Sequence, residues 1–323
     1  MKGFVKRFSR ELEVVAALAV IMIVFGLIQP IYFSPDNLLD ILDQSVINGL
    51  LAIGMTLVII TGGIDLTVGS TLAIVIVSVG NFTVMGLRPV PAVLAGMVIG
   101  FVLGLVNGIL VAKMKLQPFV ATLGMMSVYR GVAYLITGGW PVLNIPQTFR
   151  NLMDGDVVGS LSSSMILFLV VTVIAYILLK HTKFGTYLYS IGSNEEATRL
   201  SGVNVDRNKI MAYAICGVTV ALSAMVMLAK LGTGEPAAGA SYETNAIAAA
   251  AIGGTSLAGG KGSIIGTFLG AILLQALKVG LVVCGVDTFW QYIATGLIIV
   301  FAVYVDVIQG KLSAMRLNKK AKA

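Results

Sequence analysis

The chain has 323 residues, of which 57% are hydrophobic and 11% are charged, with a net charge of +7. Soluble domains carry about 25% charged residues, so this composition excludes a water-soluble core and requires lipid to cover the apolar excess. A basic soluble chain would suggest nucleic-acid binding, but in a membrane protein the same charge is typical of cytoplasmic loops. With one histidine and two cysteines, we expect no metal centre and no disulfide framework.

Apolar stretches long enough to cross a bilayer, about 20 residues each, recur along the whole chain. In chain order, the predicted spans cover 14–30, 38–60, 66–86, 91–112, 118–137, 163–180, 210–230, 244–258, 263–283 and 290–308. The first follows basic residues, as in a signal peptide, but no clear cleavage site comes after it, so it is interpreted as a membrane helix. The eighth is short, and the glycines of 253–262 beside it predict a broken helix or a re-entrant turn.

The placement of lysine and arginine indicates the orientation. With the N-terminus inside, the cytoplasmic segments are 1–13, 61–65, 113–117, 180–209, 253–262 and the tail from 309. They hold 17 of the 22 lysines and arginines, a strong bias toward the cytoplasm. The sequence therefore predicts one all-α transmembrane domain over 1–323, with about ten transmembrane helices and both termini cytoplasmic.

The segment 180–209 is the longest predicted cytoplasmic loop, and it contains a short helix signal. Asn194 can cap the helix, and the helix dipole favours the acidic residues in its first turn. Gly202 can end it in the left-handed conformation. The helix would comprise Asn194, Glu195, Glu196, Ala197, Thr198, Arg199 and Leu200. It is either a solvated connector or a docking helix on which a cytoplasmic motor acts.

Two glycine-rich segments predict tight turns. In TGGIDLTVGS, Gly62 and Gly63 can end one helix, and Asp65 can cap the next. Asp65 alternatively acts in gating or holds the turn against a partner chain, and we expect it near the inner interface, where a charge costs little. In GGTSLAGGKG, Gly253 and Gly254, like the first glycine pair, are expected to have positive φ or close packing.

The string GGTSLAGGKG is not an ATP-binding loop. A Walker A motif requires glycine where Thr255 stands, and serine or threonine where Gly262 follows Lys261. Any ATP-driven activity therefore requires a separate ATPase.

Arg130 is predicted to lie about 12 residues into its span, on the order of 18 Å from the inner face. A charge at that depth should face protein or water. Asp43, at matching depth from the outer face, is the expected ion-pair partner, and Asp40 one turn above could substitute. Lys278 and Glu243 form a second candidate pair. The alternative is that Arg130 lines a path for a hydrophilic solute.

Three strings, TLVIITGGIDLTVGS, IGSNEEATRLSGVNVDRNKI and AIAAAAIGGTSLAGGKGSIIGTFLGA, resemble the ribose-type monosaccharide permeases of bacterial ABC importers. The resemblance runs from about Asn37 to Asp306. Within 180–209, Glu196, Ala197 and Gly202 also match the coupling motif of importer permeases, although Thr198 replaces its second alanine.

The resemblance implies a type II importer-like permease in the bacterial cytoplasmic (inner) membrane. It implies a permease homodimer or a pair of related permeases, two ATP-binding cassettes that bind ATP and Mg²⁺, and an extracytoplasmic sugar-binding protein. No cofactor is expected in this chain, and the sugar is not specified. The ATPase-coupling candidates are Asn194, Glu195, Glu196, Ala197, Arg199 and Gly202. The gating or pathway candidates are Gly62, Gly63, Asp65, Arg130, Gly253 and Gly254.

Two other classes of function are less compatible with the sequence. A secondary transporter coupled to protons or sodium would need buried acids as ion sites, and most of the predicted spans carry none. A membrane enzyme would need clustered histidine or acidic residues at a membrane edge, and the chain has a single histidine.

Overall fold

The computed structural model describes residues 9–287 and scattered positions between 289 and 304. This part of the chain is helical, apart from one short hairpin. In chain order its elements are α2 (Ser9–Ile28), η1 (Pro30–Phe33), α3 (Pro35–Ile60), α4 (Val68–Val84), α5 (Pro89–Ala112), α6 (Pro118–Thr137), α7 (Gln147–Asp154), β1 (Asp156–Val158), β2 (Leu161–Ser162), α8 (Ser163–His181), α9 (Lys183–Ser193), α10 (Glu195–Leu200), α11 (Val205–Leu231), α12 (Tyr242–Ile252) and α13 (Ile264–Val283).

Local sequence signals set where several helices begin. Proline occupies the first turn of α3, α5 and α6, where its missing N–H has no intrahelical role. Serine caps start α8 and α13: Ser162 accepts a hydrogen bond from the backbone of Met165, and Ser263 accepts one from Gly266. Polar and proline residues between apolar runs therefore mark the helix starts correctly.

Seven helices in the described part of the chain are long and apolar enough to cross a membrane: α2, α3, α5, α6, α8, α11 and α13. The apolar helix α4 is shorter, with 17 residues, and α12 has only 11. The prediction that the eighth span continues to 258 is wrong, because the chain leaves the helix after Ile252 and turns at Gly254, where φ is +85°. The tenth predicted span, 290–308, and the tail after it lie outside the described residues, isolated positions aside.

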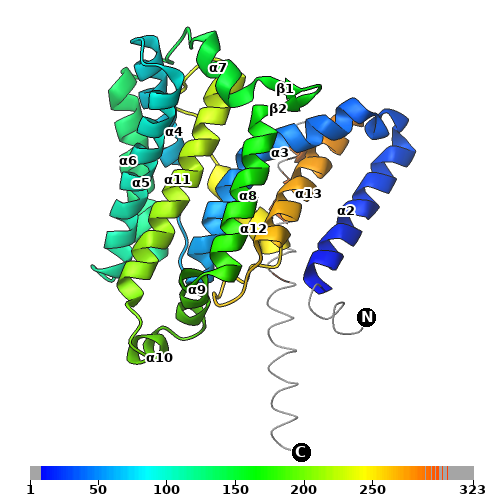
Figure 1. Ribbon diagram of the computed structural model, residues 1–323. Helices are drawn as coiled ribbons and strands as arrows, with labels where there is room; N and C mark the ends of the chain where they lie inside the picture. Colours follow the sequence, from blue (N-terminus) through cyan, green and yellow to red (C-terminus); the bar gives the residue numbers. More distant parts are fainter. Residues whose placement is uncertain are drawn as a thin grey trace, which may run out of the picture.

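The long helices stand side by side and carry different polar segments at their two ends (Figure 1). At one end lie α7 and the hairpin, in which β1 pairs antiparallel with β2 and Asp156 stands opposite Ser162. At the other end lie α9, α10 and the start of α2. The predicted loops 138–162 and 180–209 therefore occupy opposite ends of the bundle.

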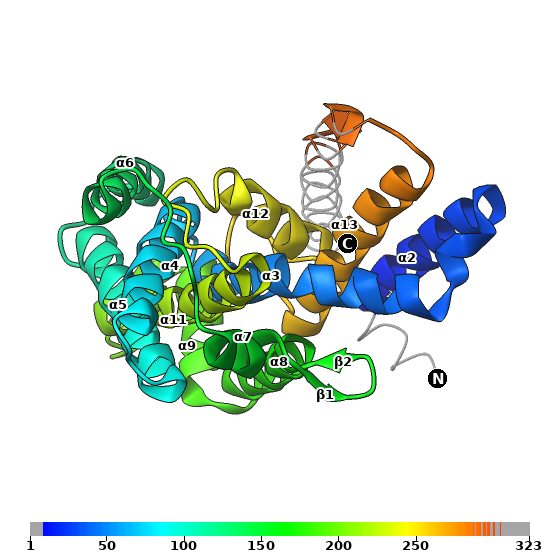
Figure 2. The ribbon, with the colours of Figure 1, turned by 90° about the horizontal axis from the view of Figure 1, so that it is seen from above.

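The bundle has a protein-buried centre and a lipid-facing jacket. In α3, α11 and α13, between 61% and 78% of the apolar span is buried inside the protein, whereas in α2, α5, α6 and α8 the share is 17% to 28%. Seen from above, α3 and α4 run through the interior, and α2 stands at one side next to α13 (Figure 2). The exposed apolar residues of the jacket are those that a bilayer would cover.

Glycines allow the closest helix pair, α5 against α11, to pack backbone to backbone. A Cβ added to Gly100 would lie 2.2 Å from the carbonyl oxygen of Gly217, and one added to Gly104 would lie 2.2 Å from that of Tyr213. No side chain fits in these gaps. This is the small-residue packing expected where helices associate in lipid.

Candidate functional site

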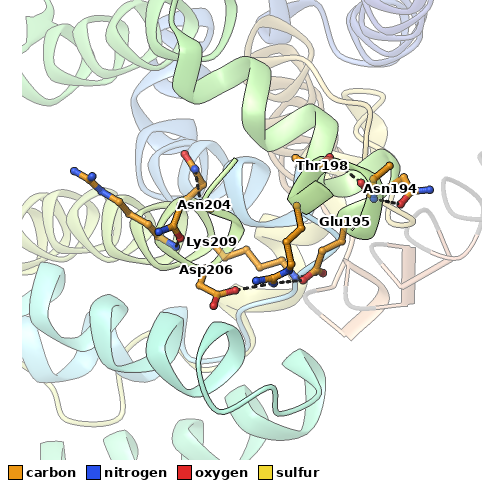
Figure 3. Close-up of polar contacts among 10 residues, drawn as sticks. Asn194, Glu195, Thr198, Asn204, Asp206 and Lys209 are labelled. Carbon is orange, nitrogen blue, oxygen red and sulfur yellow. Dashed lines mark hydrogen bonds and ion pairs between the residues drawn. The ribbon is translucent and has the colours of Figure 1, made fainter. Parts of the chain in front are cut away.

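The short helix α10 has the geometry that the sequence predicted. Asn194 caps it, with Oδ1 accepting a hydrogen bond of 2.9 Å from the backbone N–H of Ala197. Gly202 follows the helix with φ at +83°, in the left-handed region. Thr198 is buried and donates its hydroxyl to the carbonyl of Asn194 (Figure 3). Leu200, the last residue of the helix, is 84% exposed. Leu200 therefore presents an apolar side chain to the surroundings of this chain.

Ion pairs fasten α10 to the start of α11. Glu195 pairs with Lys209 at 2.5 Å, and Arg199 bridges Glu195 at 3.2 Å and Asp206 at 2.8 Å (Figure 3). Partial burial opposes ionisation of Glu195, but the hydrogen bond and charge of Lys209, together with Arg199, outweigh it and lower the pKa of Glu195. The carboxylate is thus ionised at neutral pH, and α10 is tied to a helix of the buried centre.

Three segments from distant parts of the sequence meet at glycines: the end of α3, the end of α9 and the loop 253–262. The backbone N–H of Gly260 donates to the carbonyl of Ile60 at 2.9 Å. A Cβ added to Gly192, near the end of α9, would lie 1.9 Å from the same carbonyl oxygen. One added to Gly259 would lie 2.9 Å from the backbone nitrogen of Gly62. The end of α3, the end of α9 and the loop 253–262 are therefore in direct backbone contact.

The four predicted turn glycines all have a structural reason. Gly62 and Gly254 have positive φ, at +81° and +85°. At Gly63 an added Cβ would lie 2.7 Å from the hydroxyl oxygen of Tyr213. At Gly253 it would lie 2.3 Å from the carbonyl carbon of Gly266. The expectation of positive φ or close packing is confirmed at each of them.

Asp65 lies deeper inside the protein than the sequence suggested. The residue is only 2% exposed, so its carboxylate is buried in protein, and its position near the inner interface stays a prediction. Oδ1 accepts hydrogen bonds from the backbone N–H and the hydroxyl of Thr67, at 2.9 and 2.6 Å, and from the amide of Asn107 at 3.4 Å. Tyr129 in turn donates to Asn107. Asp65 therefore joins the turn before α4 to α5 and α6.

The predicted ion pair between Arg130 and Asp43 is wrong. Arg130 Nη1 donates instead to the backbone carbonyls of Pro236 and Ala238, at 2.8 and 2.6 Å. A matching depth along two helices does not fix which helices are neighbours. The helix α6 packs mainly on α4, whereas α3 packs mainly on α11, α13 and α12.

The actual partners of Asp43 were missed from the sequence. Lys230, near the end of α11, pairs with Asp43 and, at 2.9 Å, with Asp154 of α7. Ser162 and Ser164 donate hydrogen bonds to Asp43 at 2.8 and 3.2 Å. The second predicted pair is not seen either: Lys278 Nζ lies 3.5 Å from Asn245 Oδ1 rather than against Glu243. In the described residues no group of three or more His, Cys, Asp or Glu side chains is placed to hold a metal ion.

Comparison with known proteins identifies the family. A family described as the permease component of the branched-chain amino acid transport system matches residues 37–303. The ribose import permease protein of Escherichia coli K12 is 40% identical, over 94% of this chain and 95% of its own. That of Bacillus subtilis is 41% identical over 90% of each chain.

A galactose/methyl galactoside import permease of Escherichia coli K12 is 34% identical over 94% of this chain and 95% of its own. No solved structure matches. The three-string resemblance thus extends to the whole chain. The chain therefore belongs to the permease components of bacterial ABC importers, in the branch of the ribose-type sugar permeases, and is a multi-pass transport subunit of the cytoplasmic membrane rather than an enzyme.

Proposed function

We propose that this chain forms the translocation pathway of an ATP-driven, binding-protein-dependent sugar importer. The observation that carries the coupling part of the proposal is α10: a short helix, capped at one end by Asn194 and ended by Gly202, with Leu200 exposed at its tip. The relatives named for ribose and galactose import support a monosaccharide as solute.

The complete transporter would contain a second copy of this chain or a related permease, two ATP-binding cassettes and an extracytoplasmic binding protein. The cassettes would bind ATP and Mg²⁺. We propose about ten transmembrane helices and cytoplasmic termini, an arrangement in which α10 would lie on the side of the cassettes. The excess of basic residues in 180–209 and the N-terminal segment supports this orientation.

In this mechanism, movement of a cassette reaches the membrane helices by two routes. The first runs from α10 through the ion pairs of Glu195 and Arg199 into α11. The second runs back through α9, whose end at Gly192 contacts the end of α3 and the loop 253–262. Because these contacts involve backbone atoms without intervening side chains, displacement of α9 must displace both neighbours.

Reconstitution of the complex in proteoliposomes tests the proposal. Uptake of radiolabelled ribose, galactose or fructose should require ATP on the side of the membrane where the cassettes lie. It should also require the binding protein on the opposite side. A cassette variant that binds but does not hydrolyse ATP should abolish it. Uptake driven by a proton or sodium gradient without ATP would instead support the secondary transporter and contradict the proposal.

A further inference from the structure

The connection between α11 and α12 is an unwound segment inside the bundle. It runs from Gly232, where φ is +67°, to Ser241, where φ is +65°. Gly234 exchanges backbone hydrogen bonds with Val142 at 2.8 and 2.9 Å. An added Cβ at Gly234 would lie 3.3 Å from the carbonyl oxygen of Ile76, a residue midway along α4. The segment therefore runs beside a membrane helix, with Gly234, Pro236 and Gly239 buried and Glu235, Ala237 and Ala240 exposed.

The same segment reaches the first turn of α4 before α12 begins. An added Cβ at Gly69 would lie 2.1 Å from the carbonyl oxygen of Gly239. The helix α12 then continues between α4 and α13 (Figure 2). Irregular backbone at membrane depth persists only where protein buries it or where it lines a water-filled path.

Arg130 donates hydrogen bonds to this backbone and has further N–H donors in its guanidinium group. It is residue 13 of the 20 in α6, partly buried, and its Nη1 donates to the carbonyls of Pro236 and Ala238. A guanidinium has five N–H donors. In the part of the chain that the structure describes, no acceptor binds Nε or Nη2 of this side chain. These donors can therefore bind a solute.

An opposite charge lies beside Arg130 without closing an ion pair. Glu243, in the first turn of α12, follows five residues after Ala238, whose carbonyl accepts a hydrogen bond from Arg130. Even so, the ion pairs shorter than 4.0 Å in the described residues do not include the two. An added Cβ at Gly69 would lie 2.9 Å from Glu243 Oε2, so the carboxylate lies where the unwound segment meets α4. Tyr134, one turn from Arg130 on α6, is 42% exposed.

We propose that Arg130 and Glu243, beside the unwound segment 232–241, form a contact site for the hydroxyl groups of the sugar during its passage. This inference rests on the proposed function and adds where the sugar contacts the translocation pathway. The guanidinium donates to hydroxyl oxygens, and the carboxylate accepts from hydroxyl hydrogens. A neutral polyol satisfies both groups, whereas a charged solute would leave one of them uncompensated in a region of low dielectric. Tyr134 offers a ring face to the C–H groups of the same sugar.

The test uses the complete complex in proteoliposomes with the binding protein saturated by each sugar, so that its own affinity does not limit uptake. Glu243→Gln keeps the shape of the side chain and removes its charge, whereas Arg130→Lys keeps the charge and removes the planar fork of donors. Glu235→Gln is the matched control, because Glu235 is an exposed carboxylate of the same unwound segment with no described partner. Both site variants should import the preferred sugar about tenfold more slowly, because each loses roughly one hydrogen bond to a charged group. Glu235→Gln should import the sugar at the wild-type rate.

Monodeoxy analogues separate contact from mere positioning. The wild-type complex should import at least one monodeoxy analogue more slowly than the parent sugar. In Glu243→Gln or Arg130→Lys the difference between that analogue and the parent should disappear, because the missing partner is already lost. In the control Glu235→Gln, ATP hydrolysis without sugar and the yield of folded complex should remain as in the wild type.

Two results would overturn the inference alone: normal import by both site variants, or an equal loss for the parent sugar and every deoxy analogue. Loss of folded complex in both variants would also overturn it, since the pair would then be structural. Failure of the wild-type complex to import any of ribose, galactose and fructose would overturn the proposed function itself, and this inference with it.

Discussion

At the scale of single residues, Gly192 is a position where the backbone of two other segments excludes any side chain. An added Cβ would lie 1.9 Å from the carbonyl oxygen of Ile60 and 2.4 Å from the backbone nitrogen of Gly260. Both are backbone atoms, so relief requires two segments to separate. We expect Gly192→Ala to lower the yield of folded permease several-fold and to abolish uptake, as measured by size-exclusion chromatography and transport in proteoliposomes.

The control for this substitution is Gly124→Ala, because an added Cβ at Gly124 of α6 meets nothing within 4 Å. Alanine is the better helix former by about 0.5–1 kcal/mol, so this variant should be as stable as the wild type or more so. Equal yield and uptake for the two variants would show that the contact of α9 with α3 is dispensable.

Lys230 is the residue whose loss should affect the opposite end of the bundle most. It compensates two partly buried carboxylates, Asp43 and Asp154. Lys230→Met leaves both without a cation, whereas Asp43→Asn still leaves Lys230 paired with Asp154. We expect Lys230→Met to lower the free energy of unfolding by about 2 kcal/mol, measured as a drop in thermal stability in detergent, and Asp43→Asn to cost less.

Asp40→Asn is the control for the Lys230 experiment, because Asp40 lies on the same helix as Asp43, is exposed and has no ion pair among the described residues. Its thermal stability should equal that of the wild type. A smaller loss for Lys230→Met than for Asp43→Asn would contradict the shared role of the lysine.

At the scale of elements, α10 is expected to transmit force through its tip. Leu200 contacts little of its own chain, so Leu200→Asp should leave folding intact but remove apolar contact with a cassette. We expect stimulation of ATP hydrolysis by the binding protein to fall to the basal level. The neighbouring exposed residue supplies the control: Ser201→Asp should retain most of the stimulation. If Leu200→Asp is stimulated like the wild type, the tip of α10 is not the docking contact.

Local elements were predictable from the sequence to within a few residues, and tertiary partners were not. The cap at Asn194 and the left-handed Gly202 depend on neighbours within one turn, so the pattern NEEATRLSG is sufficient. The partner of Arg130 depends on which helix lies next to α6, and matching depth carries no information about that. The eighth span was predicted to continue to 258, whereas α12 ends at Ile252. The sequence left 231–243 between two spans, but it carries no information on which helix that connection lies against.

At the scale of the whole molecule, the two polar ends of the bundle define a testable topology. The hairpin end carries α7, β1 and β2, and the other end carries α9 and α10 (Figure 1). The bias of lysine and arginine predicts that the second end is cytoplasmic. Because the basic residues are spread over several segments, the orientation should persist when a single membrane helix is perturbed.

Reporter fusions decide this topology. Alkaline phosphatase, which is active only outside the cytoplasm, should be active when fused after residue 150 and inactive when fused after residue 195 or at the C-terminus. A fluorescent protein that folds only in the cytoplasm should give the reverse pattern, which controls for failed expression. The C-terminal fusion is the most informative, because cytoplasmic termini require an even number of spans. An active phosphatase there would contradict the prediction of ten spans and would put an odd number between the two ends of the chain.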